Sequence, residues 1–312
     1  MSWINHMQRL RWIILFFVSF YGWVKANPML NAAVHLDVSH ACALGFTQGI
    51  TEFLPVSSTG HMILINELFL KNGTDYLGTV SNSTQIALNH YMVCIQLGTI
   101  WVLLLFYRRE IKKMLAGLMG KNNEGLRLAF HVAIAFVPVG LLGFIGGDWI
   151  QTHLYNRSCV LAAIFVGGIL IFFVENYRKR QQIRWTLEDM PTKIALGIGL
   201  FQLIALWPGF SRSLATIIGG VVLGMSLVQS VHFSFLLGLL TSTIATGYKF
   251  LKSGSEMLQH LDVISMLMGV TIAFAVGMIT IHAFLGYLKK NGLSLFGYYR
   301  LGLAVIFTIF TK

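Results

Sequence analysis

Long apolar segments recur along most of this sequence and constrain its fold more than any other feature. Six stretches contain almost no charge, and each approaches the length needed to cross a hydrocarbon core of about 30 Å. They lie at 90–107, 128–148, 159–176, 230–250, 263–288 and 294–311. Only 11% of the 312 residues are charged, against roughly 25% in soluble domains. Because the runs are continuous rather than alternating, they predict an all-α, multi-spanning integral membrane protein.

The net charge of +11 is concentrated in the connections between these segments. Basic residues crowd 108–127 and 177–193, whereas Arg157 alone marks the connection between those two regions. Short basic loops of membrane proteins face the cytoplasm, so we expect 108–127 and 177–193 to be cytoplasmic. We place Lys289, Lys290 and Arg300 on the same side. The basic residues are not interleaved with aromatic ones as in RNA-binding proteins, so nucleic acid is not expected as a partner.

Residues 1–36 are predicted to form an N-terminal segment distinct from the rest of the chain. Arg9 and Arg11 precede the apolar run 12–24, as in a secretory signal, and Ala26 ends a small-residue cleavage pattern. A cleaved signal and an uncleaved signal anchor both fit this pattern. Residues 37–312 then form a single polytopic catalytic domain.

Two polar motifs, residues 48–61 and 207–216, interrupt the apolar sequence. Each lies between two apolar pieces that are shorter than the about 20 residues needed to span a bilayer. These pieces are 41–54 and 62–70 around the first motif, and 194–207 and 214–224 around the second. Pro55 and Pro208 break the helical pattern, so each motif predicts a re-entrant helical hairpin.

Three predicted spans follow each hairpin, which divides the chain into halves at about 37–176 and 192–311. Since three is odd, the second half would be inserted with the opposite orientation to the first. Gln48 precedes Pro55 by seven residues, Gln202 precedes Pro208 by six, and serines follow each proline. This pattern predicts an inverted-topology repeat whose interrupted segments meet near the middle of the membrane.

The first motif contains a carboxylate at membrane depth. Gln48 and Glu52 are four residues apart and share one helix face. A buried carboxylate is costly unless it is paired or binds a cation. Glu52 is therefore a candidate functional residue, and a purely structural ion pair with Arg212 is the alternative.

Hydroxyl and imidazole groups follow Glu52. Ser57, Ser58 and Thr59 fit a helix cap or turn, but His61 beside them suggests chemistry as well. A serine or histidine nucleophile with acid–base partners divides a phosphoryl transfer into two steps. Histidine titrates near neutral pH, which suits proton delivery to a leaving oxygen.

The second motif offers cationic and hydroxyl groups. Arg212 presents a planar fork of donors that can grip a phosphate at two points. Ser211 and Ser213 would lie at a new helix N-terminus, where free N–H groups favour an anion. Thr216 lies one turn further on. The two motifs together predict hydrolysis of a phosphate or diphosphate ester, and a lipid-phosphate transporter is the alternative, since inverted repeats are also common in transporters.

At these residues the sequence resembles the bacterial undecaprenyl-diphosphatases, also called bacitracin-resistance proteins. The family pattern is present as Gln48-Gly-Ile-Thr-Glu52, Pro55-Val-Ser-Ser-Thr-Gly-His61 and Pro208-Gly-Phe-Ser-Arg-Ser-Leu-Ala-Thr216. The resemblance covers about residues 37–312. It implies hydrolysis of undecaprenyl diphosphate to undecaprenyl phosphate and inorganic phosphate, which recycles the lipid carrier for cell-wall synthesis and confers bacitracin resistance.

The resemblance also implies roles for individual residues. The catalytic residues would be Glu52, Ser58, His61 and Arg212. Phosphate would be bound by Arg212 together with Ser57, Ser211, Ser213 and Thr216. Whether Ser58 or His61 is the nucleophile, or water attacks directly, stays open.

A divalent metal, Mg2+ or Ca2+, is a further implication, held by Glu52 and Gln48, although many relatives have glutamate where this chain has Gln48. The enzyme would reside in the bacterial inner membrane with its site facing the periplasmic side. Bacitracin would compete for the substrate, and the protein would form a homodimer.

Overall fold

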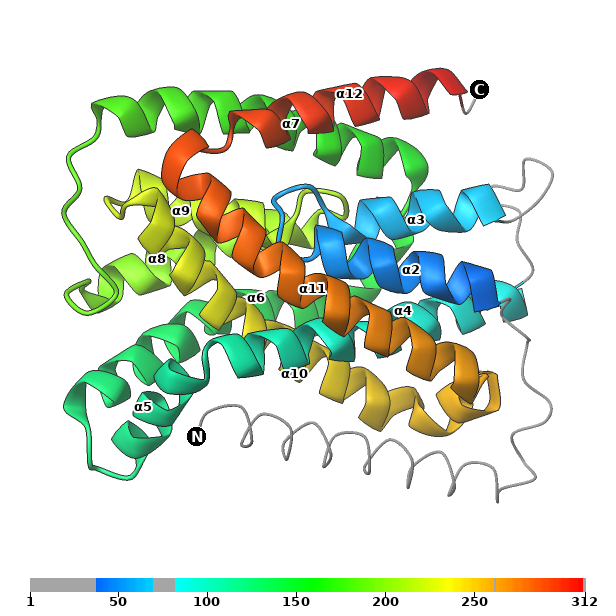
Figure 1. Ribbon diagram of the computed structural model, residues 1–312, viewed down its shortest axis with the longest axis horizontal. Coiled ribbons are helices and arrows are strands. Elements are labelled where there is room, and N and C mark those ends of the chain that lie inside the picture. Colours follow the sequence, from blue (N-terminus) through cyan, green and yellow to red (C-terminus); the bar gives the residue numbers. More distant parts are fainter. Residues whose placement is uncertain (1–37, 70–81, 261, 311–312) are drawn as a thin grey trace, which may run out of the picture.

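A computed structural model describes residues 38–69, 82–260 and 262–310. In these ranges the regular elements are helices, apart from one isolated bridge between Trp185 and Met225. The predicted N-terminal segment 1–36 lies outside the described residues. The all-α prediction is confirmed for the part of the chain that the structure describes (Figure 1).

Five described helices are long and apolar enough to cross a membrane. They are α4 (Asn82–Phe106), α6 (Asn123–Leu154), α7 (Arg157–Arg180), α10 (Leu227–His260) and α11 (Val263–Asn291). A sixth apolar helix, α12 (Ser294–Phe310), is shorter, with 17 residues. These helices match the six predicted spans. The first of these helices begins earlier than its predicted span 90–107, because α4 already starts at Asn82.

The connection 108–127 contains a helix that the sequence reading missed, α5 (Arg108–Leu118). It packs against the start of α6. The contact is very close, since a Cβ added to Gly117 would lie 2.6 Å from the carbonyl carbon of Gly125. Gly117 and Gly125 therefore allow α5 and α6 to approach each other closely. The basic segment 108–118 is helical because it can pack against α6.

The remaining helices are short and come in two pairs. They are α2 (Val38–Thr51) with α3 (Ser58–Phe69), and α8 (Thr192–Gln202) with η2 (Leu203–Leu206) and α9 (Arg212–Val222). Helix α2 packs on α11, and α8 packs on α6. Each contact is made at a glycine: added Cβ atoms on Gly45 and Gly199 would lie 2.9 Å from the Cα of Gly269 and 2.8 Å from the Cα of Ala135. Small residues that let helix backbones approach are typical of membrane helix interfaces.

The turns within the two pairs share an unusual backbone feature. Ser57 and Ser211 have positive φ values of 76° and 84°, and they are the only non-glycine residues with positive φ in the described chain. Each directly precedes a helix, and each side chain accepts a hydrogen bond from the backbone N–H three residues on, at Gly60 and Leu214. Such strained conformations concentrate at functional sites.

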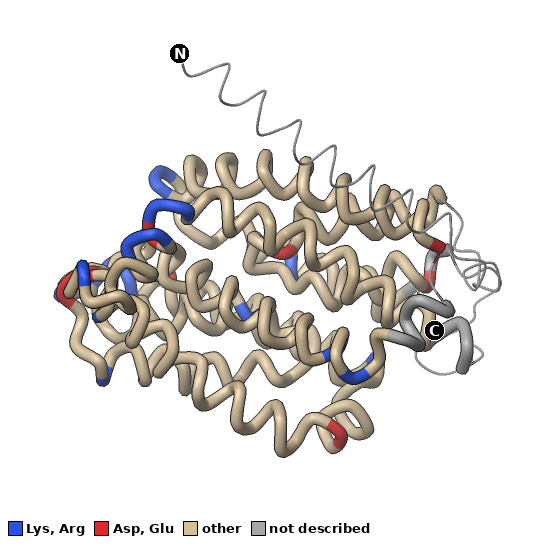
Figure 2. The backbone as a smooth tube through the Cα atoms, turned by 90° about the horizontal axis from the view of Figure 1, so that it is seen from below, with Lys and Arg blue, Asp and Glu red and all other residues tan. Residues whose placement is uncertain are grey.

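Charged residues are distributed unevenly over the bundle. Many Lys and Arg residues gather at one end of the bundle (Figure 2), and the connections 108–127 and 177–193 lie at one end of it (Figure 1). Arg300 departs from our expectation: it does not lie on the basic side but is completely buried in α12. We placed Arg300 with Lys289 and Lys290 from the sequence because all three are basic. In the structure, the packing of α12 against its neighbours buries Arg300 inside the protein.

Candidate active site

The carboxylate of Glu52 joins the two polar motifs. It follows the end of α2 and is 9% exposed. Its Oε2 accepts hydrogen bonds from Ser58 Oγ at 2.9 Å and from Gln48 Nε2 at 3.1 Å. Its Oε1 accepts a hydrogen bond from Arg212 Nη2 at 2.6 Å, across 160 positions of sequence. The structure therefore brings the acid, the hydroxyl and the guanidinium to one point.

Arg212 begins α9, and its guanidinium crosses the neighbouring helix α10 at Gly238. A Cβ added to Gly238 would overlap Nη1 and lie 2.7 Å from Cζ. The absence of a side chain at Gly238 thus makes the room in which Arg212 reaches Glu52. Sequence reasoning missed Gly238, because a glycine within an apolar span carries no local sign of this contact.

Gln48 lies in the last turn of α2, four residues before Glu52, and is almost completely buried. Its Nε2 also donates to Thr99 Oγ1 at 3.4 Å. Its Oε1 has no hydrogen-bond partner among the described residues. A buried amide oxygen without a partner is costly, so this atom marks a position where a bound group would be stabilised.

The hydroxyls of the second motif have two different surroundings. Ser211 Oγ and Ser213 Oγ lie 3.0 Å apart, and Ser213 Oγ donates to the Leu54 carbonyl of the first motif at 3.3 Å. Thr216 is turned into the protein, where its Oγ1 bonds the Arg212 carbonyl at 2.9 Å and Ser234 Oγ at 2.6 Å. The serines therefore lie at the junction of the motifs, whereas Thr216 supports the first turn of α9.

His61 lies on α3, one turn after Ser58. Its Nδ1 is 2.7 Å from the Ser57 carbonyl oxygen, and its Nε2 is 2.6 Å from the hydroxyl of Tyr299 on α12. Both ring nitrogens are thus occupied by groups other than Ser58 and Glu52. Tyr299 was not predicted, because it lies 238 positions away and a tyrosine within a mostly apolar span is not unusual.

Arg300 ties the two interrupted turns together. Its guanidinium donates to the carbonyls of Pro55 at 3.2 Å and Gly209 at 3.1 Å, one in each motif. Two further bonds, both 3.0 Å, reach the carbonyls of Ala163 and Ile164 on α7. No acidic side chain among the described residues forms a salt bridge with it. An arginine within an otherwise apolar span was the sequence signal that could have identified it.

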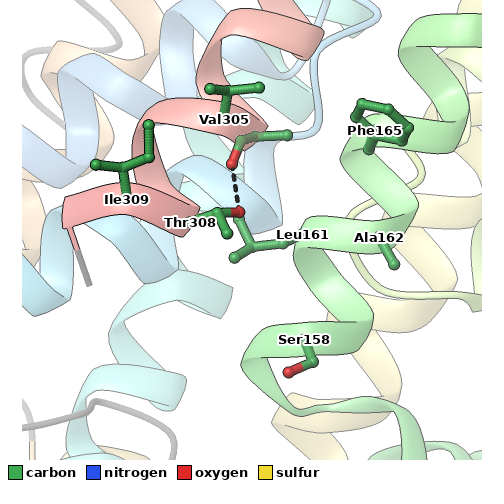
Figure 3. A pocket seen from close by; sticks show the side chains of 8 residues that line it. Ser158, Leu161, Ala162, Phe165, Val305, Thr308 and Ile309 are labelled. Carbon is green, nitrogen blue, oxygen red and sulfur yellow. Dashed lines mark hydrogen bonds between the residues drawn. The ribbon is translucent and has the colours of Figure 1, made fainter. Parts of the chain in front are cut away.

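An apolar groove of about 470 Å³ lies elsewhere, between α7 and α12 (Figure 3). Its lining includes Leu161, Phe165, Val305 and Ile309. No residue of the two motifs contributes to it. The groove therefore belongs to the apolar surface of the helix pair and not to the polar site.

The sequence of this chain matches one protein family over most of its length. The sequence model of the family described as bacitracin resistance protein BacA matches residues 41–306, which include both motifs and Arg300. The chain belongs to this family.

Curated relatives of this BacA-family protein share most of their length with it. An undecaprenyl-diphosphatase of Sorangium cellulosum is 36% identical over 269 residues, covering 85% of this chain and 84% of the relative. One from Methylococcus capsulatus is 37% identical over 274 residues, covering 87% and 95%. Undecaprenyl-diphosphatase 1 of Clostridioides difficile is 38% identical over 272 residues, again covering 87% and 95%.

Proposed function

We propose that this BacA-family protein hydrolyses undecaprenyl diphosphate to undecaprenyl phosphate and inorganic phosphate, and so recycles the lipid carrier. The observation that carries the proposal is the meeting of Ser58, Glu52 and Arg212 within hydrogen-bond distance. A hydroxyl, a carboxylate and a guanidinium thus lie together in a chain with five described helices able to span a membrane. That combination suits a phosphate ester on a lipid tail.

In the mechanism we propose, Ser58 is the nucleophile and Glu52 the general base. The Ser58 hydroxyl already donates to Glu52 Oε2, so its proton has an acceptor when Oγ attacks the terminal phosphorus. The bond from that phosphorus to the bridging oxygen breaks, and the lipid monophosphate leaves. Water then attacks the phosphoserine, which releases inorganic phosphate and restores the hydroxyl. With Ser58 as the nucleophile, His61 assists proton transfer through Nε2. A nucleophilic His61 is less favourable, because Nδ1 is bonded to the Ser57 carbonyl and Nε2 would first have to lose the Tyr299 hydroxyl.

Arg212 binds the phosphates in this proposal, with Ser211 and Ser213 at the start of α9. Its Nη2 is engaged by Glu52, and when Glu52 takes the proton of Ser58 the guanidinium is released to the developing negative charge. A preorganised donor at the site of charge development is a large contribution to catalysis. Ser57 lies in the turn directly before Ser58, and the hydroxyl of Thr216 donates a hydrogen bond to the backbone carbonyl of Arg212.

The donor atoms present fit a hard divalent cation such as Mg2+ or Ca2+. Gln48 Oε1 is buried without a partner among the described residues, one turn from the Glu52 carboxylate. Such ions are bound through oxygen ligands, and Mg2+ often through one or two carboxylates plus substrate phosphates. Glu52 and Gln48 would hold the ion, which would neutralise charge on the diphosphate.

We further propose that the chain is an inverted repeat with a re-entrant hairpin in each half. The hairpins α2–α3 and α8–α9 carry strained serines at matching places, Ser57 and Ser211. Helix α2 packs on α11 while α8 packs on α6, as expected if α6 and α11 are equivalent. The basic end would face the cytoplasm and the site the periplasm. Competition by bacitracin for the substrate and a homodimeric state complete the proposal.

The test is phosphate release from undecaprenyl diphosphate by detergent-purified protein supplied with Mg2+ or Ca2+. We expect turnover in the native protein and its loss in Glu52→Ala, Ser58→Ala and Arg212→Ala. Trapping of a phosphoenzyme that is absent from Ser58→Ala would identify the nucleophile. Folded protein that releases no phosphate but moves polyprenyl phosphate across vesicles would instead support the transporter.

A further inference from the structure

Tyr299 of α12 lies against the imidazole ring of His61 on α3. The Tyr299 hydroxyl lies 2.6 Å from His61 Nε2, and the two rings are nearly parallel, with an interplanar angle of 6° and centroids 5.6 Å apart. His61 is 9% exposed and Tyr299 is 46% exposed. The tyrosine therefore covers the imidazole and connects it to the outer surface of the bundle.

The hydrogen bonds determine which nitrogen of His61 carries the proton. A backbone carbonyl oxygen can only accept, so Nδ1 must donate to Ser57 O across their 2.7 Å contact. In the neutral ring Nε2 is then the acceptor, and the Tyr299 hydroxyl donates to it. The proton on Nδ1 is committed to the hydrogen bond with the Ser57 carbonyl. If that bond is kept, His61 can take up or release a proton only through Nε2.

The position of Tyr299 is itself fixed by its neighbour. Arg300 anchors this turn of α12 to the carbonyls of Pro55 and Gly209. An added Cβ at Gly167 would lie 2.8 Å from the Arg300 Cζ, so the anchor occupies a close-fitting space. The tyrosine hydroxyl is therefore held against His61 by the same residue that joins the two motifs.

We infer that Tyr299 is a positioning residue for the phosphatase reaction: its hydroxyl donates to Nε2 of the neutral His61 ring and can accept from Nε2–H once that nitrogen has taken a proton, so the ring keeps one orientation in both states. This inference rests on the proposed role of His61 in proton transfer. It goes beyond the two polar motifs, because it assigns to the last helix a part in the acid–base chemistry. The tyrosine itself is not required to touch the substrate.

The experiment compares Tyr299→Phe, His61→Gln and the double variant in the phosphate-release assay. Phenylalanine keeps the stacked ring and removes only the hydroxyl. The matched control is Tyr298→Phe, since Tyr298 is the preceding residue of α12 but packs its ring on Phe172. We expect Tyr299→Phe to lower kcat about tenfold, the effect of one hydrogen bond to a group that becomes charged, with KM unchanged within about twofold. Tyr298→Phe should match the native protein.

The double variant separates a positioning role from a general structural one. If Tyr299 acts through His61, adding Tyr299→Phe to His61→Gln lowers kcat no further. An equal loss in both backgrounds would overturn the inference, as would native kcat in Tyr299→Phe when His61→Gln is impaired. Full turnover in His61→Gln would refute the role of His61 itself.

A second measurement does not depend on turnover. In protein labelled with 15N-histidine, the signals missing from His61→Gln identify the His61 ring. We expect Tyr299→Phe to shift the Nε2 signal and Tyr298→Phe to leave it in place. An unshifted Nε2 signal in Tyr299→Phe would show that the hydroxyl does not hold this nitrogen.

Discussion

Gly238 offers a direct test of whether the position of Arg212 decides activity. In Gly238→Ala the new methyl group overlaps the guanidinium and lies 2.7 Å from its Cζ. Favourable contacts between carbon atoms begin near about 3.5–4.0 Å, so Cζ must move by about 1 Å. The group that moves is the end of a flexible side chain and not backbone. The fold should therefore survive while the arginine leaves its place beside Glu52.

The consequence for rate follows from that displacement. Arg212 Nη2 now contacts Glu52 Oε1 at 2.6 Å, and a shift of about 1 Å takes the pair beyond good hydrogen-bond distance. A misplacement of this size at a reacting centre can lower the rate about 100-fold. Alanine also favours a helix over glycine by about 1 kcal/mol, which offsets part of the weakened ion pair. We expect kcat/KM to fall about 100-fold and stability to change little.

The assay is phosphate release from undecaprenyl diphosphate, with thermal melting measured on the same preparations. Gly247→Ala is the control, because Gly247 lies on the same helix and an added Cβ there meets nothing within 4 Å in the described structure. Native activity in Gly238→Ala would refute the reasoning. A melting temperature that collapses together with activity would also refute it, since the displacement is argued to be local.

Three further predictions concern the site and its supports. Glu52→Gln keeps the shape but leaves Arg212 without its anion, so we expect phosphate release to fall at least about 100-fold; near-native turnover would exclude Glu52 as the base. Arg300→Met leaves four carbonyls without their donor and should lower the free energy of unfolding by at least about 3 kcal/mol, measured by denaturation in detergent. Gly302→Ala lies on the same helix, and an added Cβ there meets no atom of the described residues within 4 Å, so this variant should unfold like the native protein. Equal stability of Arg300→Met and Gly302→Ala would contradict the anchoring role. Chelation with EDTA should abolish turnover, and added Mg2+ or Ca2+ should restore it. Gln48→Ala should need a higher metal concentration for the half-maximal rate, and an unchanged metal requirement would exclude Gln48 from the metal site.

Much of the site was predictable because its residues are unusual for their surroundings. A carboxylate and an arginine at membrane depth are costly unless they serve each other or a ligand, so Glu52 and Arg212 stood out from an apolar sequence. The ion pair between them, which the sequence offered as the alternative to a functional role for Glu52, is present in the structure. Tyr299 and Gly238 could not be found this way, since a tyrosine or a glycine in an apolar helix is ordinary. Their roles exist only through contacts with side chains far away in sequence.

The sequence by itself determined that the chain is a bundle of apolar helices, because continuous uncharged runs leave the backbone no other way to satisfy its hydrogen bonds in lipid. It also indicated the two interruptions, since Pro55 and Pro208 lie next to serine clusters and between apolar pieces too short to span a bilayer, whereas Pro138 lies inside the long helix α6. Only the tertiary structure decided which groups meet. Close approach through glycines at α2 with α11 and α8 with α6, and the anchoring of both turns by Arg300, bring Ser58, Glu52 and Arg212 together. These are packing contacts between distant segments, and no local pattern specifies them.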